Sequence, residues 1–255
     1  MMEQYLSIEF IILVCLCFTA AFIDSIAGGG GLISLPAYLA CGLPPHMALG
    51  TNKMSGLSSS IGSSLNYALS RKVNWKLIRK LIPFSFIGAF IGVKAVIATK
   101  PQYINYIVFV ALVLVLIYTS ANKKIGKEST YTGLTKNNIV KGIFMALILG
   151  FYNGYLGPGT GSFLVFFMMK IFGYDFVEAN GDSKILNLAG NITGFLVFLL
   201  NGKILFSYGI PLSIIMFIGA QCGSKCAISK GNKFIKPVFL TVTMVTAGKM
   251  LLEMF

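Results

Sequence analysis

The chain alternates between long apolar runs and short polar links, and the runs fall into two groups of five. They lie at about residues 5–27, 31–43, 46–70, 75–98, 103–120, 138–158, 161–173, 179–201, 205–226 and 234–253. About 20 consecutive apolar residues are needed for an α-helix to cross the hydrocarbon core of a bilayer. The pattern therefore predicts an all-α integral membrane protein with roughly eight to ten transmembrane helices.

The second run of each group is too short to cross a bilayer. The runs at residues 31–43 and 161–173 are each only about 12 or 13 residues long, and each follows directly on a glycine-rich break. Glycine permits backbone angles that interrupt a helix. We therefore expect two short broken or re-entrant hairpin segments at corresponding places of the chain.

Residues of the first group recur in the second about 131 positions later. They are Gly42, Ala48, Lys53 and Lys72, opposite Gly173, Ala179, Lys184 and Lys203. We therefore divide the chain into a first membrane repeat at residues 1–121, a polar inter-repeat loop at 122–136 and a second membrane repeat at 137–255. Because an odd number of segments precedes the second copy, the two five-segment repeats are expected to be inverted, as in many secondary transporters.

The composition excludes a soluble protein. Hydrophobic residues make up 56% of the 255 residues and charged residues 11%, and the mean hydropathy is +0.80. A soluble domain needs more polar residues to keep its surface hydrated. The lipid bilayer is therefore the expected surroundings of nearly the whole chain.

The net charge of +13, from 21 Lys and Arg against 8 Asp and Glu, is also typical of a nucleic-acid-binding protein. Here, however, the basic residues gather in three polar links between apolar runs, as they do in cytoplasmic loops. The three clusters are Arg71, Lys72, Lys76, Arg79 and Lys80; Lys123, Lys124, Lys127, Lys136 and Lys141; and Lys225, Lys230, Lys233 and Lys236. We therefore expect no nucleic-acid partner, a multi-pass position in the cytoplasmic membrane with these links inside, and both termini outside.

The residues that carry most enzyme chemistry are scarce in this sequence. The five cysteines are scattered and His46 is the sole histidine, so no metal-ligand spacing is met and no metal or other cofactor is expected. His46 lies near no Gly-x-Ser-x-Gly motif, which argues against a serine hydrolase. It follows two prolines at a predicted loop, where a capping or interfacial role is favoured over a proton relay. The chain is therefore not expected to be an enzyme.

An ordered series of motifs runs through both halves. The first half contains DSIAGGGG at residues 24–31, GTNK at 50–53 and KVNW at 72–75, and the second contains GYLGPGTG at 154–161 and SK at 183–184. In this order the motifs resemble the two repeats of the TauE/SafE family of sulfite exporters. The resemblance implies an inner-membrane permease for small sulfur-containing anions such as sulfite or organosulfonates. An anion channel, or a transporter of another small anion or a metabolite, is the alternative.

Both glycine breaks precede a short helix, and a helix that begins inside the membrane offers a site for an anion. Its first N–H groups have no partner within the helix, and its dipole is positive at that end. Such groups are tolerated in the membrane only where they face a polar cavity, protein or a ligand. The residues expected to bind the substrate at these two helix starts are Gly29, Gly30, Gly31, Gly159, Thr160, Gly161 and Ser162.

Two lysines lie inside predicted helices at matching positions of the two halves. A charged side chain in the bilayer costs roughly 2.5–3.5 kcal/mol, so intramembrane lysines usually mark a transport pathway. We expect Lys53 and Lys184 to meet near the pseudo-two-fold axis and to complement a dianion. The alternative is that each extends its stem to the membrane interface. The neutral residues expected to contact the substrate beside them are Thr51, Asn52, Ser183 and Asn187.

Two carboxylates are candidates for coupling transport to an ion, either a proton or sodium. Asp24 is the carboxylate of the first break, and Asp182 lies two residues before Lys184. Burial favours the protonated form of a carboxyl group and a nearby ammonium favours the charged form, so either side chain is suited to taking up and releasing a proton. The alternative for both is a structural ion pair or a cap. The second break carries Asn153 in place of Asp24, so the two breaks are not chemically equivalent.

Small residues crowd the third run, between Ser55 and Ser64. Small side chains let helices approach one another closely in lipid, and they also leave room for a wet pathway. We favour packing, with a wet pathway on another face of the same helix as the alternative. Nothing in the sequence pattern sets the oligomeric state.

Overall fold

The computed structural model describes residues 8–98, 128–131, 133–235, 237–238, 240–241 and 244. Within these residues the regular secondary structure is α-helical, which confirms the predicted all-α class. The helices are α2 (Ile8–Ala27), α3 (Gly31–Ala40), α4 (Pro45–Leu69), α5 (Trp75–Ala98), α7 (Lys136–Tyr155), α8 (Thr160–Phe172), α9 (Phe176–Leu200) and α10 (Phe206–Lys230). The predicted run at 103–120, most of the run at 234–253 and part of the inter-repeat loop lie outside the described residues.

Local sequence signals explain several of the helix boundaries. Helix α4 begins with Pro45, whose fixed backbone angle suits the first position of a helix. Helix α9 begins at a capping box, in which the side chain of Asp175 accepts the N–H of Glu178 at 2.8 Å. Helix α8 ends at Gly173, whose φ of 73° lies in the left-handed region that stops a helix. These ends hold α8 and α9 in a tight hairpin.

The surface of the described bundle is that of a membrane protein. Helices α2, α5, α9 and α10 are long and apolar enough to cross a membrane, and α3 and α8 are shorter apolar helices. Large apolar side chains are exposed on the outer helices, among them Ile11 of α2, Ile87 of α5, Ile148 of α7 and Ile214 of α10. A soluble protein rarely leaves apolar patches of this extent in water. The protein is therefore a multi-pass membrane protein.

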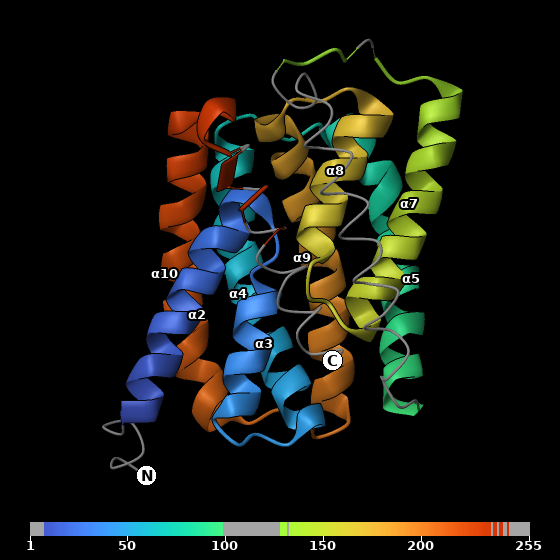
Figure 1. The fold of residues 1–255 in the computed structure, drawn as a ribbon. Helices are drawn as coiled ribbons and strands as arrows, with labels where there is room; N and C mark the ends of the chain where they lie inside the picture. The colour runs from blue at the N-terminus through green and yellow to red at the C-terminus, as the bar shows by residue number, and fades with distance from the viewer. Residues whose placement is uncertain are drawn as a thin grey trace.

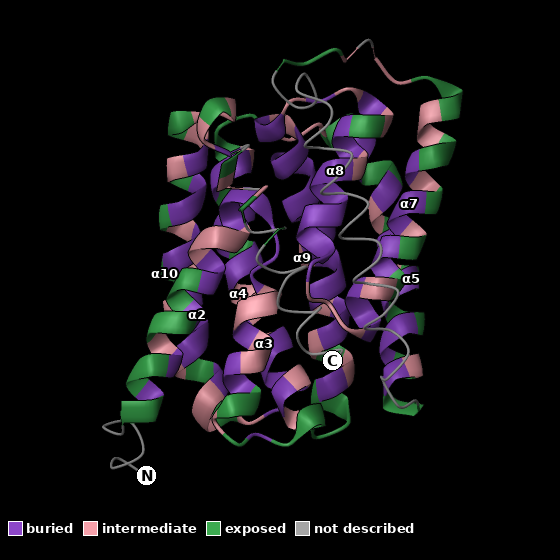
Figure 2. Cartoon of the chain, viewed as in Figure 1, coloured by how far each residue is buried: buried purple, intermediate pink, exposed green. Residues whose placement is uncertain are grey.

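The helices pair across the two halves of the chain. Helix α2 packs against α10 on one side of the bundle, and α5 packs against α7 on the other (Figure 1). Helices α4 and α9 contact each other between these pairs. Figure 2 shows that α9 is buried along most of its length. The two central helices therefore carry polar side chains that the outer helices shield from lipid.

The described parts of the three basic links lie at one end of the bundle. The link from α4 to α5, the start of α7 and the end of α10 gather there, and α2 starts at the opposite end (Figure 1). Exposed basic residues of these segments include Arg71, Lys72, Lys136 and Lys230. A common end is what the positive-inside pattern of the sequence predicts.

Close glycine contacts join helices of different halves. A Cβ on Gly92 of α5 would collide with the carbonyl oxygen of Phe151 in α7. At the matching position of the second half, a Cβ on Gly223 of α10 would collide with the carbonyl oxygen of Phe22 in α2. Small residues at such crossings let helix backbones touch in lipid, where no hydrophobic force drives helices together. Each outer pair of helices therefore depends on glycine at its crossing.

Alanine at Gly92 is expected to destabilise the protein by about 1–3 kcal/mol, because its Cβ would overlap the Phe151 carbonyl oxygen. Alanine at Gly56 of α4 is the matched control, since its Cβ would come no closer than 3.7 Å to Asn191. There the better helix propensity of alanine should leave stability unchanged or raise it by up to about 1 kcal/mol. Thermal unfolding in detergent measures both variants, and equal midpoints would contradict the close crossing of α5 and α7.

Two side chains of the central helices hold the starts of α5 and α10. The carboxylate of Asp182 accepts the N–H of Asn74 at 2.7 Å, and the hydroxyl of Thr51 accepts the N–H of Leu205 at 3.0 Å. Both amides belong to the residue directly before a helix, where no partner within the helix is available. Helix α9 therefore fixes a link of the first half, and α4 fixes a link of the second.

Candidate functional site

The two glycine breaks touch each other inside the bundle. Gly28 has a left-handed φ of 79°, and a Cβ on it would collide with the backbone nitrogen of Ser162. The hydroxyl of Ser162 donates to the carbonyl oxygen of Ala27 at 3.3 Å. Gly31 lies against Pro158, since a Cβ on it would be 3.1 Å from the proline Cα. The starts of α3 and α8 are therefore neighbours, although they come from different halves.

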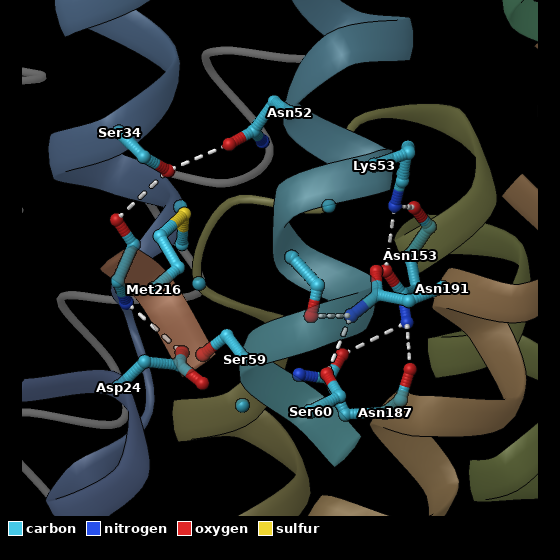
Figure 3. Close-up of a pocket in the computed structure, with 16 residues that line it drawn as sticks. Asp24, Ser34, Asn52, Lys53, Ser59, Ser60, Asn153, Asn187, Asn191 and Met216 are labelled. Carbon is cyan, nitrogen blue, oxygen red and sulfur yellow. Dashed lines mark hydrogen bonds between the residues drawn. The ribbon is translucent and has the colours of Figure 1, made fainter. Parts of the chain in front are cut away.

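A polar cavity of about 50 Å³ lies at these two helix starts (Figure 3). It is lined by Asp24, Gly30, Gly31, Ser34, Asn52, Lys53, Gly56, Ser59, Ser60, Asn153, Gly157, Gly159, Gly161, Asn187, Asn191 and Met216. The lining thus holds one ammonium, one carboxylate, neutral amides and hydroxyls, and a single thioether. At roughly 10–15 Å³ per water molecule, the volume suits a small ion.

Lys53 projects from α4 to the second break. Its side chain is buried, and its ammonium donates to the side-chain oxygen of Asn153 at 2.8 Å and to the carbonyl oxygen of the same residue. Gly194 of α9 leaves room for the stem, because a Cβ there would lie 2.8 Å from the lysine Cδ. Both acceptors are neutral, so no carboxylate among the described side chains compensates the charge of Lys53.

Lys184 projects from α9 to the first break, where it meets a carboxylate. Its ammonium donates to Oδ2 of Asp24 at 2.9 Å and to the carbonyl oxygen of Asp24. The other carboxylate oxygen accepts the N–H of Gly30 at 3.0 Å. Lys184 is fully buried and does not line the cavity, whereas the Asp24 side chain lines it and is 15% exposed. The charge of Lys184 is therefore compensated behind the cavity wall.

Each of the two lysines binds the glycine break of the other half of the chain. Lys53 belongs to the first half and binds the second break, whereas Lys184 belongs to the second half and binds the first break. The partners differ, since Asn153 stands in the second break where Asp24 stands in the first. One lysine is consequently part of an ion pair, and the other is held by a neutral amide.

The structure brings together about half of the residues that the sequence assigned to the site. The cavity wall contains Asp24, Gly30, Gly31, Asn52, Lys53, Gly159, Gly161 and Asn187. Outside the lining are Gly29, Thr51, Thr160, Ser162, Asp182, Ser183 and Lys184. His46 is exposed and lies in the first turn of α4, not in the loop that the sequence predicted there. Within the described residues, no group of His, Cys, Asp and Glu side chains could hold a metal ion.

Hydroxyl groups near the helix starts bind backbone atoms. The hydroxyl of Thr160 donates to the carbonyl oxygen of Gly157 at 2.7 Å, and that of Ser162 donates to Ala27. Such bonds stabilise the irregular backbone of each break, which otherwise leaves carbonyl groups without helical partners. The glycine breaks in the sequence located the two helix starts, but they did not give the direction of each side chain.

The cavity wall also contains residues that the sequence analysis did not assign to the substrate site. They are Ser34, Gly56, Ser59, Ser60, Asn153, Gly157, Asn191 and Met216. The hydroxyl of Ser34 donates to the side-chain oxygen of Asn52 at 2.7 Å. Asn191 follows Lys184 by about two helical turns and so lies on the same face of α9. This spacing could have identified it as a candidate site residue. Of the small residues of α4, Gly56, Ser59 and Ser60 line the cavity, whereas Gly62 packs against α10, where a Cβ would lie 2.9 Å from the carbonyl oxygen of Phe217.

Residues 13–250 match the family described as sulfite exporter TauE/SafE. The probable membrane transporter protein YfcA of Escherichia coli strain K12 is 34% identical over 238 residues, which cover 92% of this chain and 86% of the relative. The probable membrane transporter protein ORF9 of a Sinorhizobium species is 35% identical over 236 residues, or 92% and 90% of the two chains. A probable membrane transporter protein of Haemophilus influenzae is 32% identical over 242 residues, or 95% and 94%. No solved structure matches the chain.

These similarities extend over both halves and both glycine breaks. The three relatives are named as membrane transporters and not as enzymes. The names agree with the helical membrane fold and with a cavity between its helices that polar side chains line. The chain therefore belongs to the sulfite exporter TauE/SafE family of membrane transporters.

Proposed function

We propose that this protein is a secondary transporter that carries a small sulfur-containing anion, such as sulfite or an organosulfonate, across the cytoplasmic membrane. The observation that supports this most is the ammonium of Lys53, buried beside a polar cavity at two helix starts. A buried charge without an opposite charge is costly. A bound anion would offset that cost, so the site favours a negatively charged ligand.

The anion would be held by backbone as well as by side chains. The starts of α3 and α8 contribute Gly30, Gly31, Gly159 and Gly161 to the lining, and the positive end of a helix dipole would attract an anion there. Gly31 and Gly161 let the two breaks lie close together beside the cavity, because a Cβ on either glycine would press on the backbone of the other break. Asn52 and Asn187 supply further amide groups from the two central helices. Lys184 acts through Asp24 in this proposal, by holding the first break in place.

We also propose that the two halves are inverted repeats that rock about the cavity. Helices α2 and α7, the first of each half, start at opposite ends of the bundle (Figure 1). The amide of Asn191 donates to the hydroxyl of Ser60 at 2.7 Å, and these residues occupy matching positions 131 residues apart. A residue that binds its own counterpart lies at a two-fold axis. A substrate beside them would lie between the halves, where alternating access places it.

For ion coupling we propose Asp24 in preference to Asp182. The carboxylate of Asp24 lines the cavity, so a proton or sodium ion that enters with the substrate would meet it there. Asp182 is fully buried outside the lining, and its carboxylate binds the backbone of Asn74. The basic end of the bundle would face the cytoplasm, which leaves the start of α2 outside.

Counterflow in vesicles tests the proposed function and separates a carrier from a channel. Vesicles containing the protein are loaded with unlabelled sulfite, diluted into a trace of labelled sulfite, and held at zero membrane potential. A carrier exchanges bound anions, so label is expected to rise transiently above its equilibrium level inside. A channel would fill the vesicles without this overshoot, and flux equal to that of protein-free vesicles would refute sulfite transport.

A further inference from the structure

We propose that the cavity selects anions with a single negative charge and rejects dianions. The inference rests on the proposed function and deepens it, since it concerns the substrate of the same cavity. A compact sulfonate or a singly protonated diprotic oxyanion would be carried, and sulfate would be excluded.

The charged side chains at the cavity sum to one positive charge, counting the part of the chain that the structure describes. Lys53 and Asp24 line the cavity, and Lys184 lies behind Asp24 with 2.9 Å between its ammonium and Oδ2. The other lining side chains are neutral. The sequence suggested two free lysines that complement a dianion, but the ion pair removes one of these charges. The remaining positive charge is that of Lys53.

The position of Asp24 makes a second negative charge unfavourable. Figure 3 shows Lys53 and Asp24 on different sides of the cavity, so a bound anion would lie between them. Its first negative charge would be matched by Lys53. Its second would face the carboxylate without a further cation, and like charges repel strongly where the effective dielectric is low. While Asp24 is ionised, a monoanion leaves the cavity neutral, whereas a dianion leaves it negative. The preference for monoanions is therefore a property of the site before a coupling ion neutralises Asp24.

The size and lining of the cavity point to a compact ligand. Its volume of about 50 Å³ accommodates a group of a few heavy atoms. Met216 supplies the one apolar side chain of the lining, so a long hydrocarbon tail would find little to pack against. The amides, hydroxyls and helix starts offer hydrogen-bond donors for the oxygens of a small oxyanion.

The second break shows which substitution tests the proposed preference for monoanions, called the charge rule below. Asn153 occupies in the second break the place of Asp24 in the first, and its side chain accepts a lysine in the same way. Asp24→Asn would therefore copy an arrangement that the fold already contains, and would raise the net charge to two. Asn153→Asp would pair Lys53 and lower the net charge to zero.

Calorimetric titration of the purified protein with methanesulfonate and with sulfate, at constant ionic strength, measures the effect. The unsubstituted protein is expected to bind methanesulfonate at least tenfold more tightly than sulfate. Asp24→Asn should raise the affinity for sulfate at least tenfold. Asn153→Asp should lower the affinity for methanesulfonate at least thirtyfold. Asp175→Asn is the control, because it removes the same charge outside the cavity and keeps a capping side chain, so the preference should be unchanged.

Equal binding of the two anions by the unsubstituted protein would overturn the charge rule while sulfite counterflow still supported transport. Binding of neither anion, together with absent sulfite flux, would overturn both the rule and the proposed function. A folded Asp24→Asn protein with unaltered preference would also refute the rule. If that variant does not fold, Asn153→Asp decides, since unchanged methanesulfonate affinity in it would remove Lys53 as the source of selectivity.

Discussion

Methionine in place of Lys53 is expected to abolish anion binding and transport while the protein stays folded. The change removes the ammonium but keeps a side chain of similar length, which still fills the space beside Gly194. Losing the partner of a buried charge costs about 2–5 kcal/mol, which is at least about 30-fold in affinity. The unliganded protein should lose little stability, because removing a buried charge also removes its desolvation cost and so offsets the lost bonds to Asn153.

Two measurements check this expectation, the stabilisation of the protein by methanesulfonate in thermal unfolding and sulfite counterflow in vesicles. Lys141→Met is the matched control, since Lys141 is exposed on α7 and lies outside the cavity lining. It removes the same charge, and both readouts should stay at the level of the unsubstituted protein. If Lys53→Met bound and carried anions as well as this control, the cavity would not be the substrate site.

The helices could be predicted from the sequence because the bilayer constrains them strongly. A segment that crosses lipid must satisfy its own backbone and present apolar side chains, so an apolar run and a helix coincide. The predicted run at 75–98 is α5, and the short run at 161–173 is α8 within one residue at each end. The short length of α8 also followed from its sequence, since Gly159 and Gly173 enclose it.

Some residues of the site could be predicted from the sequence, because an ionisable group in an apolar run is conspicuous. Lys53 and Asp24 were identified in this way, and both line the cavity. The pairing of Lys184 with Asp24 could not be predicted from the sequence, since these residues are 160 positions apart and come from different halves. A repeat shows which positions correspond, but a contact between halves depends on how their helices cross. The glycines that set those crossings, such as Gly92, are recognised only in three dimensions.

The difference between the two breaks gives the cavity its single net positive charge. With a carboxylate in both breaks, both lysines would be paired and the centre would be neutral. With an amide in both, two uncompensated ammonium groups would be buried, one at the cavity wall and one behind it, and would repel each other. The combination of Asp24 and Asn153 keeps one lysine for structure and one for the ligand. The two lysines therefore have different expected roles, which stability measurements distinguish.

Methionine in place of Lys184 is expected to destabilise the protein by about 3–5 kcal/mol, in contrast with Lys53→Met. The ammonium of Lys184 compensates the carboxylate of Asp24 at 2.9 Å. Without it, the carboxylate keeps the N–H of Gly30, at 3.0 Å, and must either stay charged without a cation or take up a proton. For a chain of this size the loss corresponds to a fall of at least about 6 °C in the unfolding midpoint.

Adding Asp24→Asn to Lys184→Met should restore most of that stability, because neutralising both partners of a buried pair leaves no unpaired charge. The two single variants and the double variant form a mutant cycle, and the expected coupling energy is at least about 2 kcal/mol. The cycle isolates the ion pair from the packing of the lysine stem, which both methionine variants preserve. If Lys184→Met were as stable as Lys53→Met, the pair would not hold the first break. Lys184 would then not be tied to Asp24, and the explanation that this pair leaves Lys53 as the one uncompensated charge of the cavity would be wrong.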